Sequence, residues 1–344
     1  MKIIVPVLLI ISIFISAFIV SPEYTFPIPK NWPKPAYNFS QNKLTPEKIL
    51  LGRALFYDPI LSKDSSISCT SCHSQYTAFA HVDHALSHGI DNRIGTRNAP
   101  ALMNLAWSKT FMWDGAINHL DMQALAPMSH PDEMGEKIED VIRKMQRSKI
   151  YPPLFKKAFG DSMISGEHLL KAISKFMLVL VSSNSKYDQV MRGKAQFETQ
   201  EKKGYILFQQ NCSSCHSEPL FTNNGFENNG LTPDTTLNDF GRMKITHQPN
   251  DSFKFKVPTL RNLEFSSPYM HDGRFKRIME VLNHYTTGIK QSKTLSKQLQ
   301  KPIVLSSNEK VDLTAFLLTL TDKNFLFDTS YSYPKFIFKV SAKE

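Results

Sequence analysis

The sequence contains little cysteine and almost no strand-like pattern. Only four of its 344 residues are cysteine, in two pairs far apart at 69–72 and 212–215. A structural zinc site usually places its two Cys pairs about 15–20 residues apart, so this separation argues against one. Apolar and polar residues alternate as in a strand only near 253–257 and 335–340. The chain is therefore expected to be mostly helical, with short strands at those two places.

Clustered basic runs are also missing. The 41 Lys and Arg outnumber the 31 Asp and Glu, but they are scattered along the chain. A nucleic-acid-binding surface would need basic clusters with aromatic residues among them, so that class of partner is excluded. A hydrophobic content of 41% with 21% charged residues is ordinary for a globular protein. The length suits about two domains, each with its own core.

Both Cys pairs belong to one motif, Cys-x-x-Cys-His, which reads Cys69-Thr70-Ser71-Cys72-His73 and Cys212-Ser213-Ser214-Cys215-His216. This is the attachment signature of a c-type haem. Two thiols one helical turn apart bond to the two vinyl groups of one porphyrin, and the adjoining His ligates the iron. A disulfide or a redox-active Cys pair needs no such His. The sequence therefore predicts two covalent haems, held by these four thiols and ligated by His73 and His216.

Matching segments indicate a duplicated unit with one haem per copy. They are Gly52-x-x-Leu55-Phe56 with Gly204-x-x-Leu207-Phe208, Pro100 to Asn104 with Pro258 to Asn262, and Trp113-Asp114-Gly115 with His271-Asp272-Gly273. Helical patterns appear near 117–126, 134–147, 166–182 and 275–285. The predicted fold class is all-α with little β. It consists of two cytochrome-c-like domains, at 45–195 and 196–344, which the family resemblance described below implies to be a peroxidatic and an electron-transfer haem domain.

The N-terminal region predicts export. Residues 3–20 carry no charge, so 1–20 are either a cleaved signal peptide or a retained membrane anchor. In both cases the body lies outside the cytoplasm, in the periplasm or beyond, where c-type haem is attached. Residues 21–44 contain five prolines and predict an extended segment. Thr45 is the expected N-cap of the first helix, with Pro46 at its first position.

Residues 45–325 resemble the bacterial dihaem cytochrome c peroxidases and the related MauG group. The resemblance rests on several motifs, which are Leu51-Gly52-Arg53-x-Leu55-Phe56, Ser68-Cys69-x-x-Cys72-His73, Arg97-Asn98-Ala99-Pro100, Trp113-Asp114-Gly115, Val257-Pro258-Thr259-Leu260-Arg261-Asn262 and Pro268-Tyr269-Met270-His271-Asp272-Gly273.

The resemblance implies an N-terminal haem whose free face accepts hydrogen peroxide. Cleaving the O–O bond requires a group that carries a proton, and Gln123 and Glu133 keep the family's spacings for that role. Trp113 would relay electrons between the haems. The alternatives are a solvated carboxylate at a helix start for Glu133 and a core aromatic for Trp113. Ile90 stands where many family members carry a gating His, which favours a permanently open haem, with His88 as the alternative gate.

The resemblance also implies further ligands. Tyr285 is the expected sixth ligand of the second haem iron, with Met270 as the second choice and a position filled by neither as the third. A calcium ion between the domains would be held by Asn98, Ser266 and Pro268, oxygen ligands that suit a hard cation.

Three functions remain open from the sequence. The first is a peroxidase that reduces hydrogen peroxide to water with electrons from a small exported cytochrome c or copper protein. The second is a MauG-like oxidase that modifies aromatic residues of a partner protein. The third is a plain electron carrier, which would not need Gln123 and Glu133. The choice between a monomer and a homodimer is also open.

Overall fold

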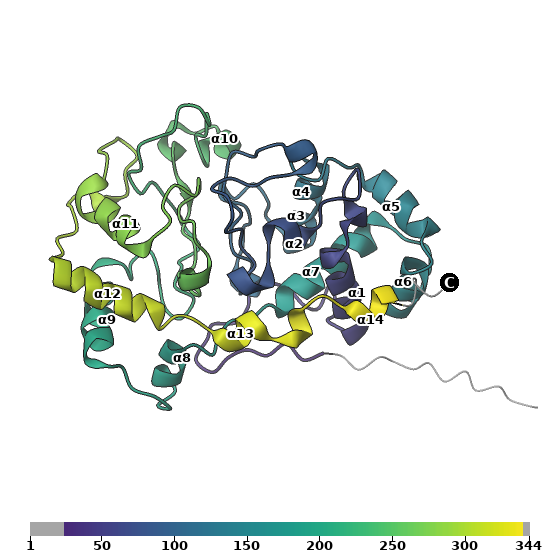
Figure 1. The fold of residues 1–344 in the computed structure, drawn as a ribbon, viewed down its shortest axis with the longest axis horizontal. Coiled ribbons are helices and arrows are strands. Elements are labelled where there is room, and N and C mark those ends of the chain that lie inside the picture. The colour runs from purple at the N-terminus through teal and green to yellow at the C-terminus, as the bar shows by residue number, and fades with distance from the viewer. Residues whose placement is uncertain (1–23, 340–344) are drawn as a thin grey trace, which may run out of the picture.

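The computed structural model describes residues 24–339, so the predicted signal peptide or anchor at 1–20 lies outside the described residues. The described part is mostly helical, as predicted (Figure 1). Its helices are α1 Pro46–Tyr57, α2 Cys69–Cys72, α3 Leu120–Gln123, α4 Leu125–Ser129, α5 Ile138–Arg147, α6 Tyr151–Phe159, α7 Gly166–Val179, α8 Lys186–Met191, α9 Thr199–Asn211, α10 Met243–Thr246, α11 Ile278–Asn283, α12 Ser307–Leu318, α13 Lys323–Phe327 and α14 Lys335–Lys339. None of them is long and apolar enough to cross a bilayer.

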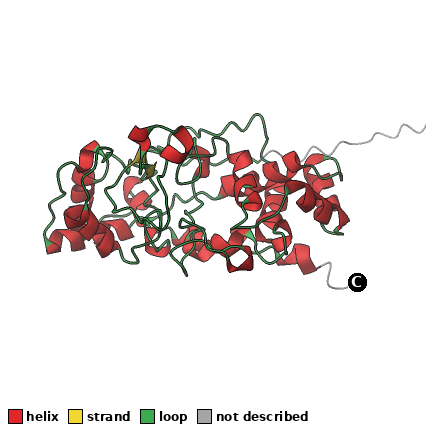
Figure 2. Cartoon of the chain, turned by 90° about the horizontal axis from the view of Figure 1, so that it is seen from above, coloured by secondary structure: helices red, strands yellow, loops and turns green. Residues whose placement is uncertain are grey.

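Very little of the described chain is strand (Figure 2). β1 Phe226–Glu227 pairs antiparallel with β2 Phe255–Lys256, so the strand predicted near 253–257 is confirmed. The strand predicted near 335–340 is wrong, because residues 335–339 form helix α14. Pro334 precedes this helix and its carbonyl accepts a hydrogen bond from the Ile337 amide. The short alternating pattern reflects one turn that buries Ile337.

The repeated Gly-x-x-Leu-Phe segments form the same packing in both halves. α1 lies against α7 in one half, and α9 lies against α12 in the other. A Cβ on Gly52 would lie 1.9 Å from the Ala172 carbonyl oxygen, and a Cβ on Gly204 would lie 1.9 Å from the Asp312 carbonyl oxygen. Only glycine allows the backbones to approach this closely. The matching segments therefore mark two equivalent helix crossings.

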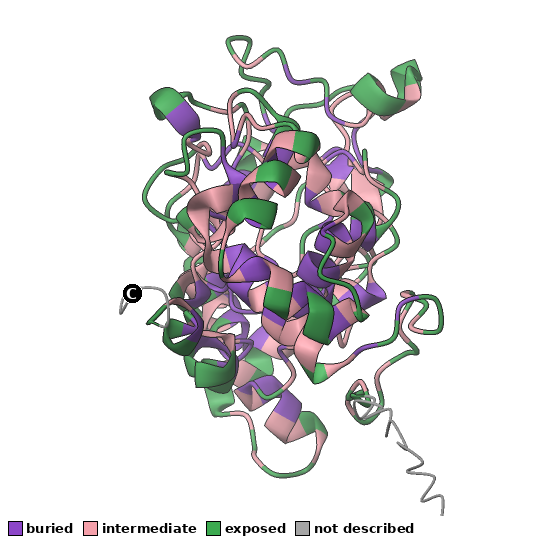
Figure 3. Cartoon of the chain, turned by 90° about the vertical axis from the view of Figure 1, so that its right-hand side faces the viewer, coloured by how far each residue is buried: buried purple, intermediate pink, exposed green. Residues whose placement is uncertain are grey.

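Each crossing lies in its own hydrophobic core, and buried faces turn inward along the helices (Figure 3). The core of the N-terminal half also receives Phe325 and Leu326 of α13. α13 and α14 run back beside the N-terminal half, at the yellow end of the chain in Figure 1. There the Gln75 side chain donates a hydrogen bond to the Asp328 carbonyl at 2.7 Å, and the Tyr57 hydroxyl donates to the Tyr331 carbonyl at 2.8 Å. The last residues of the described chain thus stabilise the half that begins it.

The Pro-rich segment follows the N-terminal half in an extended path. The Tyr37 amide donates to the Ala106 carbonyl, and the Trp107 indole donates to the Pro33 carbonyl at 2.7 Å. Helix α1 follows, and the Thr45 hydroxyl caps it by accepting from the Lys48 amide, as predicted.

A charged network joins the two halves. The Arg97 guanidinium donates two hydrogen bonds to Asp239, at 2.6 and 2.9 Å, and one to Asp114 at 2.6 Å. Asp239 is 8% exposed, so these charge-assisted bonds are shielded from water.

Candidate functional site

A cavity of about 670 Å³ lies between the two halves. It brings together residues that are more than a hundred positions apart in sequence. Among the residues predicted for function, those that line it are Cys72, His73, Asn98, Trp113, Gln123, Glu133, Cys212, Cys215, His216, Ser266, Pro268, Met270 and Tyr285. The structure therefore places nearly every candidate site residue around one space.

The first Cys pair occupies one short helix. α2 begins at Cys69 and ends at Cys72, with Ser68 and Ser71 forming a capping box before it. His73 follows directly, and its ring is held by a 2.8 Å hydrogen bond between Nδ1 and the Phe79 carbonyl. Because a carbonyl only accepts, Nδ1 carries the proton and Nε2 keeps a free lone pair. Burial lowers the pKa of His73 to about 4, so the ring is neutral at pH 7.

The second motif repeats this arrangement. Cys212 ends helix α9, and His216 follows with Nδ1 at 3.2 Å from the Phe221 carbonyl and 3.1 Å from the Pro258 carbonyl. His216 is also a neutral imidazole, because burial lowers its pKa. A ring fixed through Nδ1 with Nε2 free is the usual state of a metal-ligating histidine.

No disulfide joins the four cysteines, although each pair lies within one turn. Burial raises the pKa of Cys69 and Cys212 to about 12 and that of Cys72 to about 11. Reactive redox cysteines have a lowered pKa, so these thiols do not have that character. Each end of the one large cavity therefore carries two thiols and a neutral imidazole. This combination fits a covalent haem.

Glu133 and Gln123 lie on the cavity wall contributed by the segment that holds α3 and α4. Burial raises the pKa of Glu133, and its charge in turn raises the pKa of the Cys72 thiol, so the carboxyl group lies near the first motif. Pro127 and His130 line the same wall. Glu133 is half-buried on this wall.

The loop that carries Ile90 packs against the backbone of this wall. The Ile90 amide donates to the Glu133 carbonyl at 2.8 Å, and Ile90 is 4% exposed. His88, the alternative gate, does not line the cavity, because its ring stacks on that of His84 with centroids 4.1 Å apart. The geometry thus places no imidazole of this loop in the cavity.

Trp113 lies where the two copies of the duplicated unit meet. Its indole donates to the Asn98 carbonyl at 2.8 Å, and its own carbonyl accepts from the Lys256 amide at 2.6 Å. The Asn98 amide donates to the carbonyl of His271, the residue that matches Trp113 in the second copy. Trp113 is therefore fixed between the two halves and faces the cavity.

Tyr285 and Met270 both face the second half of the cavity. Tyr285 lies in a turn of π-helix, His284–Gly288, which continues α11. Such turns often occur at functional sites. Burial raises the pKa of Tyr285 to about 12, with smaller contributions from the charges of Cys212 and Cys215. Asn229 contacts both candidates, since its amide donates to the Met270 sulfur at 3.4 Å and hydrogen-bonds with Tyr285.

The predicted calcium ligands also share the cavity wall. The Asn98 amide nitrogen donates to the Ala85 carbonyl at 2.9 Å, so Oδ1 remains as an acceptor. Ser266 and Pro268 approach from the C-terminal half. An amide oxygen and backbone carbonyls suit Ca²⁺. No cluster of three or more His, Cys, Asp or Glu side chains suited to a metal ion occurs within residues 24–339.

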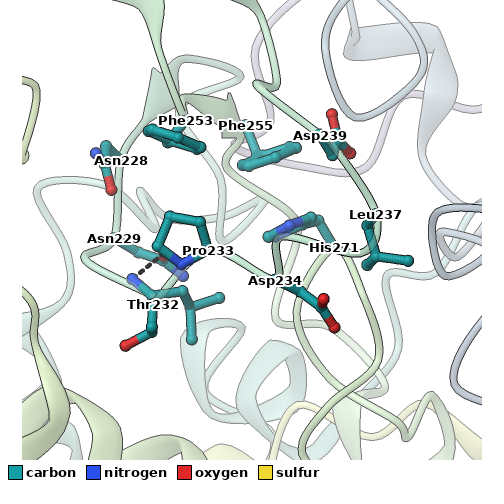
Figure 4. Close-up of a pocket in the computed structure, with 11 residues that line it drawn as sticks. Asn228, Asn229, Thr232, Pro233, Asp234, Leu237, Asp239, Phe253, Phe255 and His271 are labelled. Atoms are coloured by element: carbon teal, nitrogen blue, oxygen red, sulfur yellow. Dashed lines mark hydrogen bonds between the residues drawn. The ribbon is translucent and has the colours of Figure 1, made fainter.

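A second, much smaller cavity lies beside the main one (Figure 4). Its volume of about 10 Å³ is close to the least that holds one water molecule. His271 and Phe255 line both cavities, and their rings stack with centroids 3.6 Å apart. This side cavity is too small for a cofactor, so the chemistry belongs to the larger one.

Sequence reasoning missed several polar residues of the main cavity, among them His130, Lys244 and Lys256. Burial lowers the pKa of Lys256 to about 8, and its ammonium group donates to the Thr110 carbonyl. Lys256 directly precedes the motif that runs from Val257 to Asn262. This position was the only feature of the sequence that could have indicated its place at the site. The other two stand outside every motif.

Comparisons with known proteins agree with this geometry. A family model described as di-haem cytochrome c peroxidase matches residues 46–196. The methylamine utilization protein MauG of Methylorubrum extorquens is 36% identical over 291 residues, which cover 81% of this chain and 79% of that protein. The cytochrome c551 peroxidase of Nitrosomonas europaea is 34% identical over 276 residues, 79% of each. The chain belongs to the di-haem cytochrome c peroxidase and MauG family, so the resemblance predicted from the motifs is confirmed.

A solved structure is similar over nearly the whole chain. The crystal structure of a MauG-like protein associated with microbial copper homeostasis superposes with a TM-score of 0.81 at 30% identity. The match covers 91% of this chain and 99% of that one. The relatives include both peroxidases and MauG proteins, so membership alone does not choose between the two activities.

Proposed function

We propose that this chain is an exported dihaem c-type peroxidase that reduces hydrogen peroxide to water at its N-terminal haem. The observation that carries the proposal is the position of Glu133. It is a half-buried carboxyl group with a raised pKa, and it shares a cavity with His73 and Cys72. A carrier that only passed electrons would have no use for a proton-carrying group there.

Each haem would be held by its own motif. Cys69 and Cys72 would bond to the first and Cys212 and Cys215 to the second, while Nε2 of each following His would ligate the iron. When bound, the haem iron supplies the electrons for reducing peroxide. Lys244 and Lys256 line the cavity and would neutralise acidic groups of the porphyrins.

The side chains around the first haem would move protons. Glu133 accepts the proton of one peroxide oxygen and returns it to the other, which then leaves as water. This is general acid–base catalysis by a positioned side chain. A carboxyl group suits it because burial brings its pKa closer to neutral pH. Gln123 supplies an amide that orients the peroxide by hydrogen bonds, and the apolar walls exclude bulk water.

Electrons would reach this site from the second haem. Trp113 lies between the halves, and hydrogen bonds at both its indole and its carbonyl hold it. Tyr285 would be the sixth ligand of the second iron, with Met270 as the alternative, because both face that end of the cavity. A bound Ca²⁺ at Asn98, Ser266 and Pro268 would tie the halves together. The source would be a small exported cytochrome c or copper protein, since the apolar segment 3–20 and the c-type motifs both imply export.

A MauG-like oxidase that modifies aromatic residues of a partner protein is the second candidate. Two observations favour it. Tyr285 occupies the second haem's surroundings, and a phenolate ligand favours oxidised iron more than a thioether does. The loop at Ile90 also brings no His into the cavity, so the first haem needs no reductive opening.

The test is the Glu133→Gln variant. Both haems should stay attached, but peroxide consumption with a reduced donor should slow about 10²–10⁴-fold, the usual size of a proton-transfer contribution. The matched control is Asp132→Asn, which changes the neighbouring, more exposed carboxylate and should leave the rate within about twofold of wild type. Equal rates for wild type and Glu133→Gln would remove Glu133 from the mechanism. Peroxide consumption that never oxidises a small donor would favour the oxidase.

A further inference from the structure

The segment 289–305 forms part of the wall at the second haem's end of the cavity. It connects the π-helical turn at Tyr285 to helix α12. Its inward side chains line the cavity, namely those of Ser296, Gln298, Leu299, Ile303 and Leu305. Leu305 also packs against the core of the C-terminal half. One thickness of chain therefore separates this end of the cavity from solvent.

The outer side of the same segment carries only positive charge. Lys290, Lys293, Lys297 and Lys301 are all exposed, and none of them forms an ion pair. No acidic residue occurs in the chain between Glu280 and Glu309. Other surface lysines of the described chain do pair, as Lys171 does with Glu167. Four exposed lysines on one short segment that has no acidic residue create a local positive field.

An exposed apolar side chain follows these lysines on the same segment. Val304 is 88% exposed, the largest exposed fraction among the large hydrophobic residues of the described chain. Folding gains nothing from leaving it in water. We call Lys290, Lys293, Lys297, Lys301 and Val304 together the lysine face.

We propose that the lysine face is the docking surface for a small acidic electron-transfer protein. This inference rests on the proposed function and names the chemistry of the donor. Opposite charges steer the encounter, and the thin wall brings the donor's redox centre against the second haem's end of the cavity. Two docked donors each give one electron, two protons come from solvent, and one hydrogen peroxide becomes two water molecules. Each donor leaves oxidised by one electron.

The test compares two charge reversals in the haem-loaded protein. Lys293→Glu with Lys297→Glu changes the lysine face. Lys156→Glu with Lys157→Glu is the matched control, because these exposed lysines of α6 also lack an ion pair and lie at the opposite end of the molecule (Figure 1). The probe is a reduced acidic single-haem cytochrome c. Its chemically amidated form, which has lost the surface carboxylates, serves as the probe with altered charge.

With wild type, kcat/KM for the acidic cytochrome should fall steeply as salt is added, because exposed charges are screened. The lysine-face variant should lose about tenfold at low salt and show little salt dependence, and the amidated cytochrome should be a poor donor for wild type. The control variant should keep more than half of the wild-type value. Turnover with ascorbate should be the same in all three proteins.

Several results would overturn the docking proposal. Equal losses in the control variant would show that only net charge matters. Loss of ascorbate turnover in the lysine-face variant would show that these residues serve the cavity instead. Binding of wild type but not of the variant to phosphatidylglycerol vesicles, without binding to the acidic cytochrome, would assign the face to a membrane. If no donor supports turnover, the proposed function fails, and calorimetric binding of the acidic cytochrome still tests the face by itself.

Discussion

The Gly52→Ala substitution tests the helix crossing on which the N-terminal half is built. The added Cβ would lie 1.9 Å from the Ala172 carbonyl oxygen and 3.1 Å from the Phe176 Cβ. Contacts under 3.0 Å do not occur for real Cβ atoms, so α1 and α7 must separate by about 1 Å. A gap of that size removes a quarter to a half of the dispersion energy across the contact. Leu55 and Phe56 follow on the same helix and are fully buried, so they lose contacts as well.

The net cost can be estimated from two opposing contributions. Overpacking a core costs about 1–3 kcal/mol, and a backbone clash belongs at the upper end of that range. Alanine gains about 1 kcal/mol over glycine inside a helix. The free energy of unfolding should therefore fall by about 2 kcal/mol. Gly204→Ala should cost a similar amount, since its Cβ would lie 1.9 Å from the Asp312 carbonyl oxygen.

The assay is urea unfolding of the haem-loaded protein, monitored by circular dichroism and by the haem absorbance. Gly166→Ala is the matched control, because its Cβ would meet only the end of the flexible Ile138 side chain, at 2.8 Å. The control midpoint should stay at or slightly above that of wild type. A urea midpoint of Gly52→Ala equal to that of the control would refute the reasoning. It would show that α1 and α7 can separate without loss of stability.

Two further predictions concern the second half. Tyr285→Phe should change the low-spin haem spectrum and leave the high-spin spectrum unaltered, and an unchanged low-spin spectrum would exclude Tyr285 as a ligand. Asp188→Asn should lower the free energy of unfolding at pH 7 by about 3–5 kcal/mol, because it leaves the buried Arg261 guanidinium without its partner. Burial raises the pKa of Asp188, but the hydrogen bonds and charge of Arg261 outweigh it and hold the pKa below its ordinary value. The stability that this carboxylate contributes is therefore present above about pH 4 and lost below it. The free energies of unfolding of wild type and Asp188→Asn should converge in acid. A constant difference between them down to pH 2 would contradict this.

Local sequence signals predicted the parts of the fold that repeat. The Gly-x-x-Leu-Phe segments and the Cys-x-x-Cys-His motifs depend on neighbouring residues, and each pair forms equivalent structures in the two halves. The helix predicted at 134–147 forms at Ile138–Arg147, and that at 166–182 forms at Gly166–Val179. Residues 134–137 and 180–182 lie outside these helices, because periodicity fixes the middle of a helix better than its ends.

Contacts between segments that are far apart in the chain could not be predicted from local sequence patterns. Nothing in residues 323–339 indicates that they return to the N-terminal half, because that position depends on carbonyls that accept bonds from Gln75 and Tyr57. The alternating pattern near 335–340 wrongly predicts a strand for a related reason, since these residues form α14. Five residues with alternating character satisfy both periodicities, and packing around Ile337 decides between them.

The two copies of the duplicated unit carry different residues at matched positions where they meet, and the proposed function gives these differences a role. Trp113 and His271 are equivalent in sequence, and both bond to the backbone of Asn98. The Trp113 indole donates to the Asn98 carbonyl, whereas the Asn98 amide donates to the His271 carbonyl. Met103 and Arg261 are equivalent as well, and both are buried. In the first copy the methionine fills the core. In the second copy the arginine pairs with Asp188 and also lies 4.8 Å from the Trp32 ring centroid, on the Pro-rich segment.

Such asymmetry places different demands on the two ends of the cavity. In the proposed function the first end needs a vacant face beside a proton carrier, and it is bounded by Glu133 and by a loop that brings no His into the cavity. The second end would need a closed iron and a route to an outside donor. It is bounded by Tyr285 and by a thin segment whose outer face carries unpaired lysines. Under the proposed function, substitutions at positions where the copies do not match, such as these, are what separates a reaction site from a donor site.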